Sequence, residues 1–208
     1  MTSIDERVFL WINGLVGTSA NTTVLDRIMI WCANDYFFPV TMSLFLLAIW
    51  FFGRGRIERE SYHRAVICAF ITIGFTGSFV YVANHIYRHP HPFEYETNPE
   101  LMAAAKAATH RIFYEIWDPS FPSHTAAVTF GAAAGLWHYK HKLALLMLIP
   151  AILMPFAKVY AAVYWPSDIV AGAILGIAMS YLIRYVVLPL VEPIVSRMLA
   201  AFRKLCIA

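Results

Sequence analysis

The stretch KVYAAVYWPSD, from Lys158 to Asp168, lies between two long apolar runs of the chain. It places a lysine, two tyrosines and an aspartate where a membrane protein otherwise presents apolar side chains to lipid. Polar and ionisable residues at such positions are rare and costly, and they commonly mark functional sites. The stretch therefore predicts a polar site at the end of a membrane helix.

The composition supports a membrane protein. Of the 208 residues, 60% are hydrophobic, only 14% are charged, and the mean hydropathy is +0.60. This is too apolar for a soluble domain of the same length. A net charge of +3 is too small to indicate a nucleic-acid partner. Cys32, Cys68 and Cys206 are widely separated and show no metal or redox spacing, so no cofactor is expected.

Five apolar runs are long enough to cross a hydrocarbon core about 30 Å thick. They are Tyr36–Phe52, Arg64–Tyr87, Phe121–Trp137, Leu143–Val163 and Ser167–Leu188. A sixth run, Thr23–Ala33, is short, and it is either half-inserted or joined to the next span across Asn34 and Asp35. Residues 1–17 carry apolar side chains on one face behind a capping box from Ser3 to Glu6, which predicts an interfacial helix. The sequence thus predicts one all-α membrane domain, residues 1–208, with about five or six transmembrane helices.

The arginines predict the orientation of these helices. Arg54, Arg56, Arg59 and Arg64 fall within eleven residues, whereas the basic residues of the long loop 88–119 are diluted by acidic ones. Basic loops stay in the cytoplasm, so loop 88–119 is expected outside the cell and the tail 191–208 inside. Within the outer loop, EYETNPELMAAAKAATHRIF is expected to form a short amphipathic helix over the site.

The same threading brings three polar islands to the outer face. These islands are NHIYRHPHPF (84–93), SFPSHTA (120–126) and KVYAAVYWPSD (158–168). Although they are far apart in sequence, they are expected to converge on one site.

In this order, the three islands resemble the type-2 phosphatidic acid phosphatase and haloperoxidase superfamily. The segments FLWINGLVGTS and LDRIMIWCA also resemble the amino-terminal pattern of its bacterial undecaprenyl-pyrophosphate phosphatases, and the resemblance covers Ser3 to Leu190. It implies a site on the external face of a bacterial plasma membrane. In that site a lysine and two arginines bind phosphate and a histidine attacks phosphorus. An aspartate orients this histidine, and a second histidine protonates the leaving group.

Carried over residue by residue, the resemblance retains the framework and changes the reactive positions. The aspartate is Asp168, but the nucleophile position falls on Tyr164 and one clamp arginine on Lys158. The acid position falls on Thr125 in an ungapped reading, or on His124 if one residue is deleted. The expected phosphate-binding residues are Lys158, His91 (the second arginine position), His89, Asn84 (the lysine position) and Ser123.

These substitutions weaken the family chemistry. Lysine loses the two-pronged geometry with which arginine holds two phosphate oxygens, and histidine is a cation only when protonated. A phenol, as at Tyr164, is a poor nucleophile at neutral pH. The leading hypothesis is a protein that binds a lipid phosphate or polyprenyl pyrophosphate among membrane lipids, with impaired hydrolysis, alone or as a subunit of a larger membrane assembly.

Other readings stay open at this point. An active phosphatase could use a rearranged site of His124, His89, His91, Lys158 and Asp168. A structural or metal-binding subunit could use His85, His89 and His91, although no metal is expected. Tyr164 also suits an interfacial aromatic belt, and Lys158 could extend to the headgroups or pair with Asp168.

Overall fold

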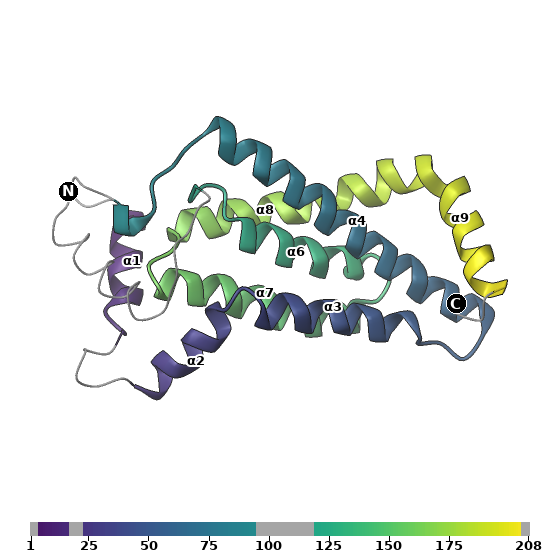
Figure 1. The fold of residues 1–208 in the computed structure, drawn as a ribbon, viewed down its shortest axis with the longest axis horizontal. Helices are drawn as coiled ribbons and strands as arrows, with labels where there is room; N and C mark the ends of the chain where they lie inside the picture. Colours follow the sequence, from purple (N-terminus) through teal and green to yellow (C-terminus); the bar gives the residue numbers. More distant parts are fainter. Residues whose placement is uncertain (1–3, 17–22, 95–118, 205–208) are drawn as a thin grey trace.

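The computed structural model describes residues 4–16, 23–94 and 119–204, and these segments are almost entirely helical (Figure 1). The helices are α1 (Ile4–Asn13), α2 (Val24–Ala33), α3 (Phe37–Trp50), α4 (Arg56–Ile86), α6 (His124–Trp137), α7 (His141–Tyr160), α8 (Pro166–Leu182) and α9 (Leu188–Lys204). A 3-10 turn, η1 (Pro92–Glu94), follows α4, and a π-helical segment, η2 (Ile183–Val187), joins α8 to α9. The amphipathic helix expected in the outer loop lies outside the described residues.

Helices α3, α4, α6, α7 and α8 run side by side along the long axis of the molecule, and α6 contacts α4, α7 and α8 (Figure 1). Glycines allow this close packing. A Cβ atom on Gly176 would lie 2.1 Å from the carbonyl oxygen of Ala127, and one on Gly135 would lie 2.7 Å from the Cα of Ala69. Only a residue without a side chain permits helices to approach so closely.

Three described helical segments are long and apolar enough to cross a membrane: Arg56–Ile86, His141–Tyr160 and Pro166–Phe202. Helices α2 and α3 pass the same test as a pair bent by 59°. Helix α6, with 14 residues, is shorter than a full span and packs inside the bundle. The expectation of an all-α membrane bundle is confirmed.

The bend between α2 and α3 has a local cause. The Oδ1 atom of Asn34 accepts hydrogen bonds from the backbone N–H groups of Tyr36, at 2.9 Å, and Phe37, at 3.1 Å. It thereby caps the start of α3 and interrupts the helical hydrogen bonds. Asp35 consequently lies in a break between two helices.

The two ends of the bundle carry different helices. At one end α1 crosses the tips of the long helices (Figure 1), where Phe9 packs against Trp165 with ring centroids 5.2 Å apart. At the other end α9 turns away from the axis of α8 (Figure 1). Arg64 of α4 forms an ion pair with Glu192 of α9 at 2.7 Å. The segment expected as a tail, 191–208, belongs to α9 as far as Lys204.

Candidate functional site

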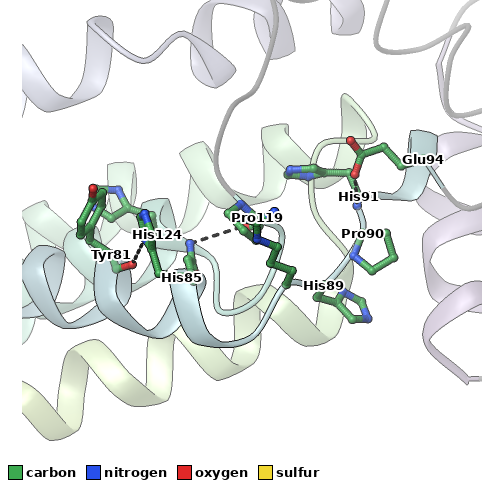
Figure 2. Close-up of a pocket in the computed structure, with 10 residues that line it drawn as sticks. Tyr81, His85, His89, Pro90, His91, Glu94, Pro119 and His124 are labelled. Atoms are coloured by element: carbon green, nitrogen blue, oxygen red, sulfur yellow. Dashed lines mark hydrogen bonds between the residues drawn. The ribbon is translucent and has the colours of Figure 1, made fainter.

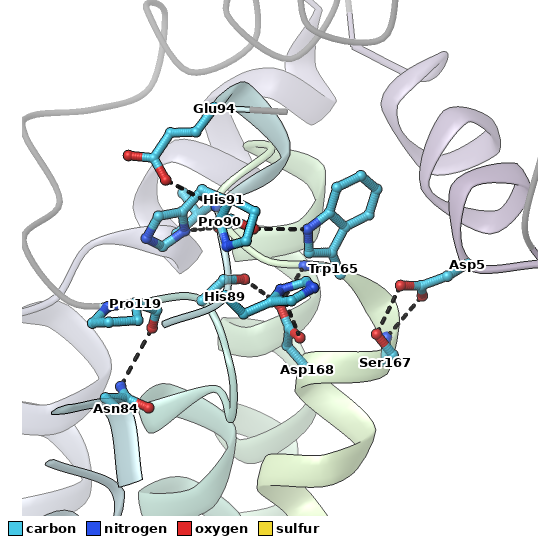
Figure 3. A network of polar contacts seen from close by, with 12 residues as sticks. Asp5, Asn84, His89, Pro90, His91, Glu94, Pro119, Trp165, Ser167 and Asp168 are labelled. Carbon is cyan, nitrogen blue, oxygen red and sulfur yellow. Dashed lines mark hydrogen bonds and ion pairs between the residues drawn. The ribbon is translucent and has the colours of Figure 1, made fainter. Parts of the chain in front are cut away.

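The three polar islands meet at the end of the bundle where α1 lies, and backbone groups connect all three (Figure 3). The first and second islands are joined by a hydrogen bond from the Ser120 N–H to the carbonyl oxygen of His89, at 3.0 Å. The second and third are joined by one from the Ser123 N–H to the carbonyl oxygen of Asp168, at 3.1 Å. The convergence expected from the helix threading is present.

A polar cavity of about 710 Å³ opens beside the first island (Figure 2). It is lined by Tyr81, Asn84, His85, Arg88, His89, Pro90, His91, Glu94, Pro119 and His124. We call it the histidine pocket. Four imidazoles and one guanidinium line it, against a single carboxylate, so its chemistry suits an anion.

Asn84 contributes an unsatisfied polar atom to this pocket. Its side chain is only 3% exposed, and its Nδ2 donates a hydrogen bond to the carbonyl oxygen of Pro119 at 3.3 Å. Its Oδ1 has no hydrogen-bond partner among the described residues. A buried acceptor without a partner is costly, and a protonated ligand oxygen or a water could satisfy it.

The ring of His91 is held in one tautomer. Its Nδ1 lies 2.5 Å from the carbonyl oxygen of Val163, which can only accept a hydrogen bond, so Nδ1 carries the proton. The ring is buried and stacks on Phe93 with centroids 5.0 Å apart. In this tautomer Nε2 is an acceptor when the imidazole is neutral and a donor when it is protonated. His91 can therefore donate to an anion through Nε2 only as an imidazolium.

The start of α6 determines which of two adjacent residues faces the pocket. Ser123 is the N-cap, and its Oγ accepts a hydrogen bond from the backbone N–H of Ala126 at 3.3 Å. His124, the first helical residue, lines the pocket, and its Nε2 would lie 3.4 Å from a Cβ on Gly77 of α4. Thr125 is about 100° further around the helix and is buried away from the pocket lining. Of the two candidates for the acid position, His124 therefore lines the pocket and Thr125 does not.

Lys158 lies outside the pocket lining. Its side chain is 4% exposed, and its Nζ is 2.5 Å from Oδ1 of Asp35 in the break between α2 and α3. From sequence, Asp168 and the lipid headgroups are the candidate partners of Lys158. The partner in the structure is Asp35. The positive charge at this clamp position is compensated within the protein.

Tyr164 also lies outside the pocket lining. It is 3% exposed, and its ring is 5.8 Å from that of His91. The phenol is thus close to the pocket wall but belongs to a buried cluster with Ala161 and Val163.

Asp168 organises the backbone around the site (Figure 3). Its Oδ2 accepts hydrogen bonds from the Ser120 hydroxyl and, at 3.1 Å, from the Trp165 N–H, and so caps α8. Its Oδ1 lies 3.9 Å from Nδ1 of His89, too far for a hydrogen bond. The imidazole that approaches the Asp168 carboxylate is therefore that of His89, in the first island. Position 164, where the superfamily pattern has a histidine, is a tyrosine.

In the metal hypothesis, His85 and His89 share one helical face. In the structure they do not, because His89 lies beyond the end of α4. Helix α4 ends at Ile86, and His85 Nδ1 lies 2.8 Å from the carbonyl oxygen of Tyr81. Figure 2 shows the His89 ring directed away from His85 and His124. Within residues 4–16, 23–94 and 119–204, no group of three His, Cys, Asp or Glu side chains is placed to hold a metal ion.

Several residues of the site escaped the sequence analysis. Tyr81 and Arg88 line the pocket, and Tyr81 stands three residues before Asn84 on α4, a spacing that puts helical side chains near one face. Trp165 donates from Nε1 to the carbonyl oxygen of Pro90 at 3.1 Å, and so fixes the histidine-bearing segment. The spacing could have indicated Tyr81, whereas Arg88, which lies beyond the end of α4, and the Trp165 contact depend on the folded arrangement.

Comparisons with known proteins agree with this arrangement. The sequence is 26% identical over 180 residues to the undecaprenyl-diphosphatase BcrC of Bacillus subtilis, covering 86% of this chain and 82% of that protein. It is 23% identical over 178 residues to the putative undecaprenyl-diphosphatase YbjG of Escherichia coli, covering 85% and 79%.

Two solved structures share the fold. LpxE of Aquifex aeolicus superposes with a TM-score of 0.59 at 21% identity, covering 87% of this chain and 94% of that chain. A PAP2-type phosphatidylglycerolphosphate phosphatase of Bacillus subtilis gives a TM-score of 0.51 at 15% identity, covering 86% and 92%. The sequence pattern of the PAP2 superfamily matches residues 65–191, which include all three polar islands. The chain therefore belongs to the PAP2 superfamily.

Proposed function

We propose that the histidine pocket binds the phosphate headgroup of a lipid phosphate or polyprenyl pyrophosphate, and that hydrolysis by the family mechanism is impaired. One observation carries the proposal. The pocket is lined by His85, Arg88, His91 and His124, whereas the positions that correspond to the nucleophile and one clamp arginine are buried outside its lining.

The electrostatics support binding more than turnover. Arg88 is a permanent cation at the pocket, and protonated imidazoles add charge-assisted hydrogen bonds to phosphate oxygens. The charge of Lys158 is compensated by Asp35, and Tyr164 offers a phenol where the mechanism needs an imidazole. Each missing electrostatic contact to the transition state typically costs about 3–4 kcal/mol, so the combined loss is large.

The surface beside the pocket suits a lipid tail. Tyr81, Val82 and Ile86, on the last turns of α4, are 64%, 55% and 81% exposed. An isoprenoid or acyl chain can extend along this apolar surface into the bilayer while the headgroup occupies the pocket. The related sequences named as undecaprenyl-diphosphatases agree with this substrate class.

The orientation belongs to the same proposal. Arg54, Arg56 and Arg59 lie at the opposite end of α4 from the pocket, and such basic clusters stay in the cytoplasm. The pocket then faces the outside of a bacterial plasma membrane, and the carboxyl terminus faces the cytoplasm. A binding role at this face also suits a subunit of a larger membrane assembly.

A phosphatase with a rearranged site is the second candidate, and the 3.9 Å approach of His89 to Asp168 favours it. This imidazole and carboxylate resemble the relay that would orient a nucleophile. The His89 ring, however, points away from His124, so the two groups do not face one phosphorus position (Figure 2). The binding proposal requires no such rearrangement.

The test uses the full-length protein in lipid nanodiscs with undecaprenyl pyrophosphate. We expect saturable binding, because the imidazoles and the Arg88 guanidinium of the pocket can donate hydrogen bonds to phosphate oxygens. His91→Gln should weaken the binding, whereas His141→Gln, at the other end of the bundle, should not.

Phosphate release is measured on the same samples. We expect little release, and Tyr164→His alone should not restore it, because the clamp would still be absent. Rapid release by the unmodified protein, abolished by His124→Ala or Asp168→Ala, would contradict the impairment and establish the rearranged phosphatase.

A further inference from the structure

Two cavities lie next to each other at the end of the bundle opposite the histidine pocket. One is polar, has a volume of about 230 Å³, and is lined by Arg54, Gly55, Arg56, Arg59, Glu60, His63 and Leu199. The other is wholly apolar, has a volume of about 480 Å³, and lies between α3, α4 and α9. They border each other where Trp50, which lines the apolar cavity, stacks on His63, which lines the polar one, with ring centroids 4.2 Å apart.

Glu60 also lines the polar cavity, and Glu58 accepts a hydrogen bond from the backbone N–H of Arg54 at 3.0 Å, but the side chains of the three arginines form no ion pair in the described part of the chain. All three arginines are exposed. By contrast, Arg64, two turns deeper, is paired with Glu60 at 3.1 Å and Glu192 at 2.7 Å. The cavity thus has an excess of positive charge at its mouth. That excess is complementary to an anionic headgroup.

Helix α9 closes the apolar cavity from the side. Ile194 and Met198 line the cavity, and the next residue, Leu199, lines the polar one. The ion pair between Glu192 and Arg64 holds α9 against α4. The two cavities therefore share one wall on α9 and another at Trp50 and His63.

The spacing of the two cavities along α4 matches the dimensions of a phospholipid. Ile67, in the apolar cavity, follows Arg56 by eleven residues on the same helix, which is about 16 Å along its axis. One leaflet of a hydrocarbon core has a thickness of about 15 Å. A lipid with its phosphate at the arginines would place its acyl chain beside Ile67.

We propose that this end of the bundle binds one anionic phospholipid from the adjacent leaflet. Arg54 and Arg59 hold its phosphate, and one acyl chain occupies the apolar cavity between α4 and α9. This site is separate from the histidine pocket and does not depend on the function proposed for that pocket.

The test is a lipid titration of the full-length protein by native mass spectrometry, with phosphatidylglycerol compared with phosphatidylcholine of the same chains. We expect the protein to bind phosphatidylglycerol more tightly. Arg54→Gln/Arg59→Gln should weaken phosphatidylglycerol binding about 25-fold, from about fivefold for each arginine near a headgroup. The matched control, Arg7→Gln/Arg27→Gln, removes two exposed arginines at the other end and should retain the affinity.

A second pair of variants tests the acyl-chain cavity. Ile194→Trp fills the cavity from a side chain that is 67% exposed, and it should weaken phosphatidylglycerol binding several-fold. Ile174→Trp, on a side chain of α8 that is 63% exposed, adds the same bulk away from the cavity and should not. Equal affinities for the two lipids would overturn the proposal. Unchanged affinity in either Arg54→Gln/Arg59→Gln or Ile194→Trp would also overturn it.

Discussion

The packing of α8 on α6 predicts that one methyl group, added at a residue outside the pocket lining, will disturb the histidine pocket. A Cβ on Gly172 would lie 2.5 Å from the carbonyl oxygen of Ser123, whereas carbon and oxygen normally approach to about 3.3 Å. Gly172→Ala therefore requires the start of α6 to move by about 0.8 Å. That movement displaces His124, the next residue, from its place in the pocket.

The cost follows from what the movement disrupts. Overpacking of this kind costs about 1–3 kcal/mol. The hydrogen bond from the Ser123 N–H to the carbonyl oxygen of Asp168, now 3.1 Å, would lengthen past its useful range, at a further cost of about 1 kcal/mol. A total of about 2–4 kcal/mol corresponds to a melting temperature lower by roughly 5–15 °C for a chain of this size.

Thermal unfolding in detergent and pyrophosphate binding are the two measurements. Gly74→Ala is the matched control, because nothing lies within 4 Å of a Cβ at that position. It should be neutral or stabilising by up to about 1 kcal/mol, since alanine favours a helix. Gly176→Ala, whose Cβ would lie 2.1 Å from the carbonyl oxygen of Ala127, should destabilise at least as much as Gly172→Ala. If Gly172→Ala melted and bound pyrophosphate like Gly74→Ala, the reasoning about helix contact would be refuted.

Three further changes probe other parts of the fold. Asp35→Asn should lower the free energy of unfolding by about 1–3 kcal/mol, because the buried ammonium of Lys158 loses the Asp35 carboxylate, which is itself 38% exposed. Chemical denaturation measures this change, and an unchanged midpoint would argue against the ion pair. Glu192→Gln should speed amide hydrogen exchange in α9, since both Glu192 carboxylate oxygens accept hydrogen bonds from Arg64 at 2.7 Å. Equal exchange rates in the variant and the unmodified protein would show that the ion pair does not hold α9. A tag inserted at Gly55 should be protected from external protease in intact cells, and cleavage there would reverse the proposed orientation.

Much of the fold follows from local properties of the sequence. Apolar runs of sufficient length predict the main helices. The convergence of the three polar islands follows once neighbouring helices alternate in direction. The helix ends were predicted less closely, since the expected spans Phe121–Trp137 and Leu143–Val163 are the helices His124–Trp137 and His141–Tyr160.

The partners of the charged residues could not be predicted in the same way. Lys158 pairs with Asp35, which is 123 residues away, because the Asn34 cap bends the chain and leaves Asp35 facing α7. Which of His124 and Thr125 faces the pocket also depended on one residue of register at the start of α6. In the folded chain Ser123 is the N-cap, and His124 lines the pocket.

Two residues that keep the superfamily pattern, Ser123 and Asp168, have structural roles in the folded chain. Ser123 caps α6, and Asp168 caps α8 and accepts from Ser120, so replacing either would remove hydrogen bonds that hold the helix ends together. The phenol at position 164 packs in a small buried cluster with Ala161 and Val163. The two caps are therefore needed for the folded site under either candidate function, whereas the family mechanism also needs an imidazole at position 164. Under the proposed function, the capped helix ends hold the headgroup site in place, and the tyrosine leaves hydrolysis without its nucleophile.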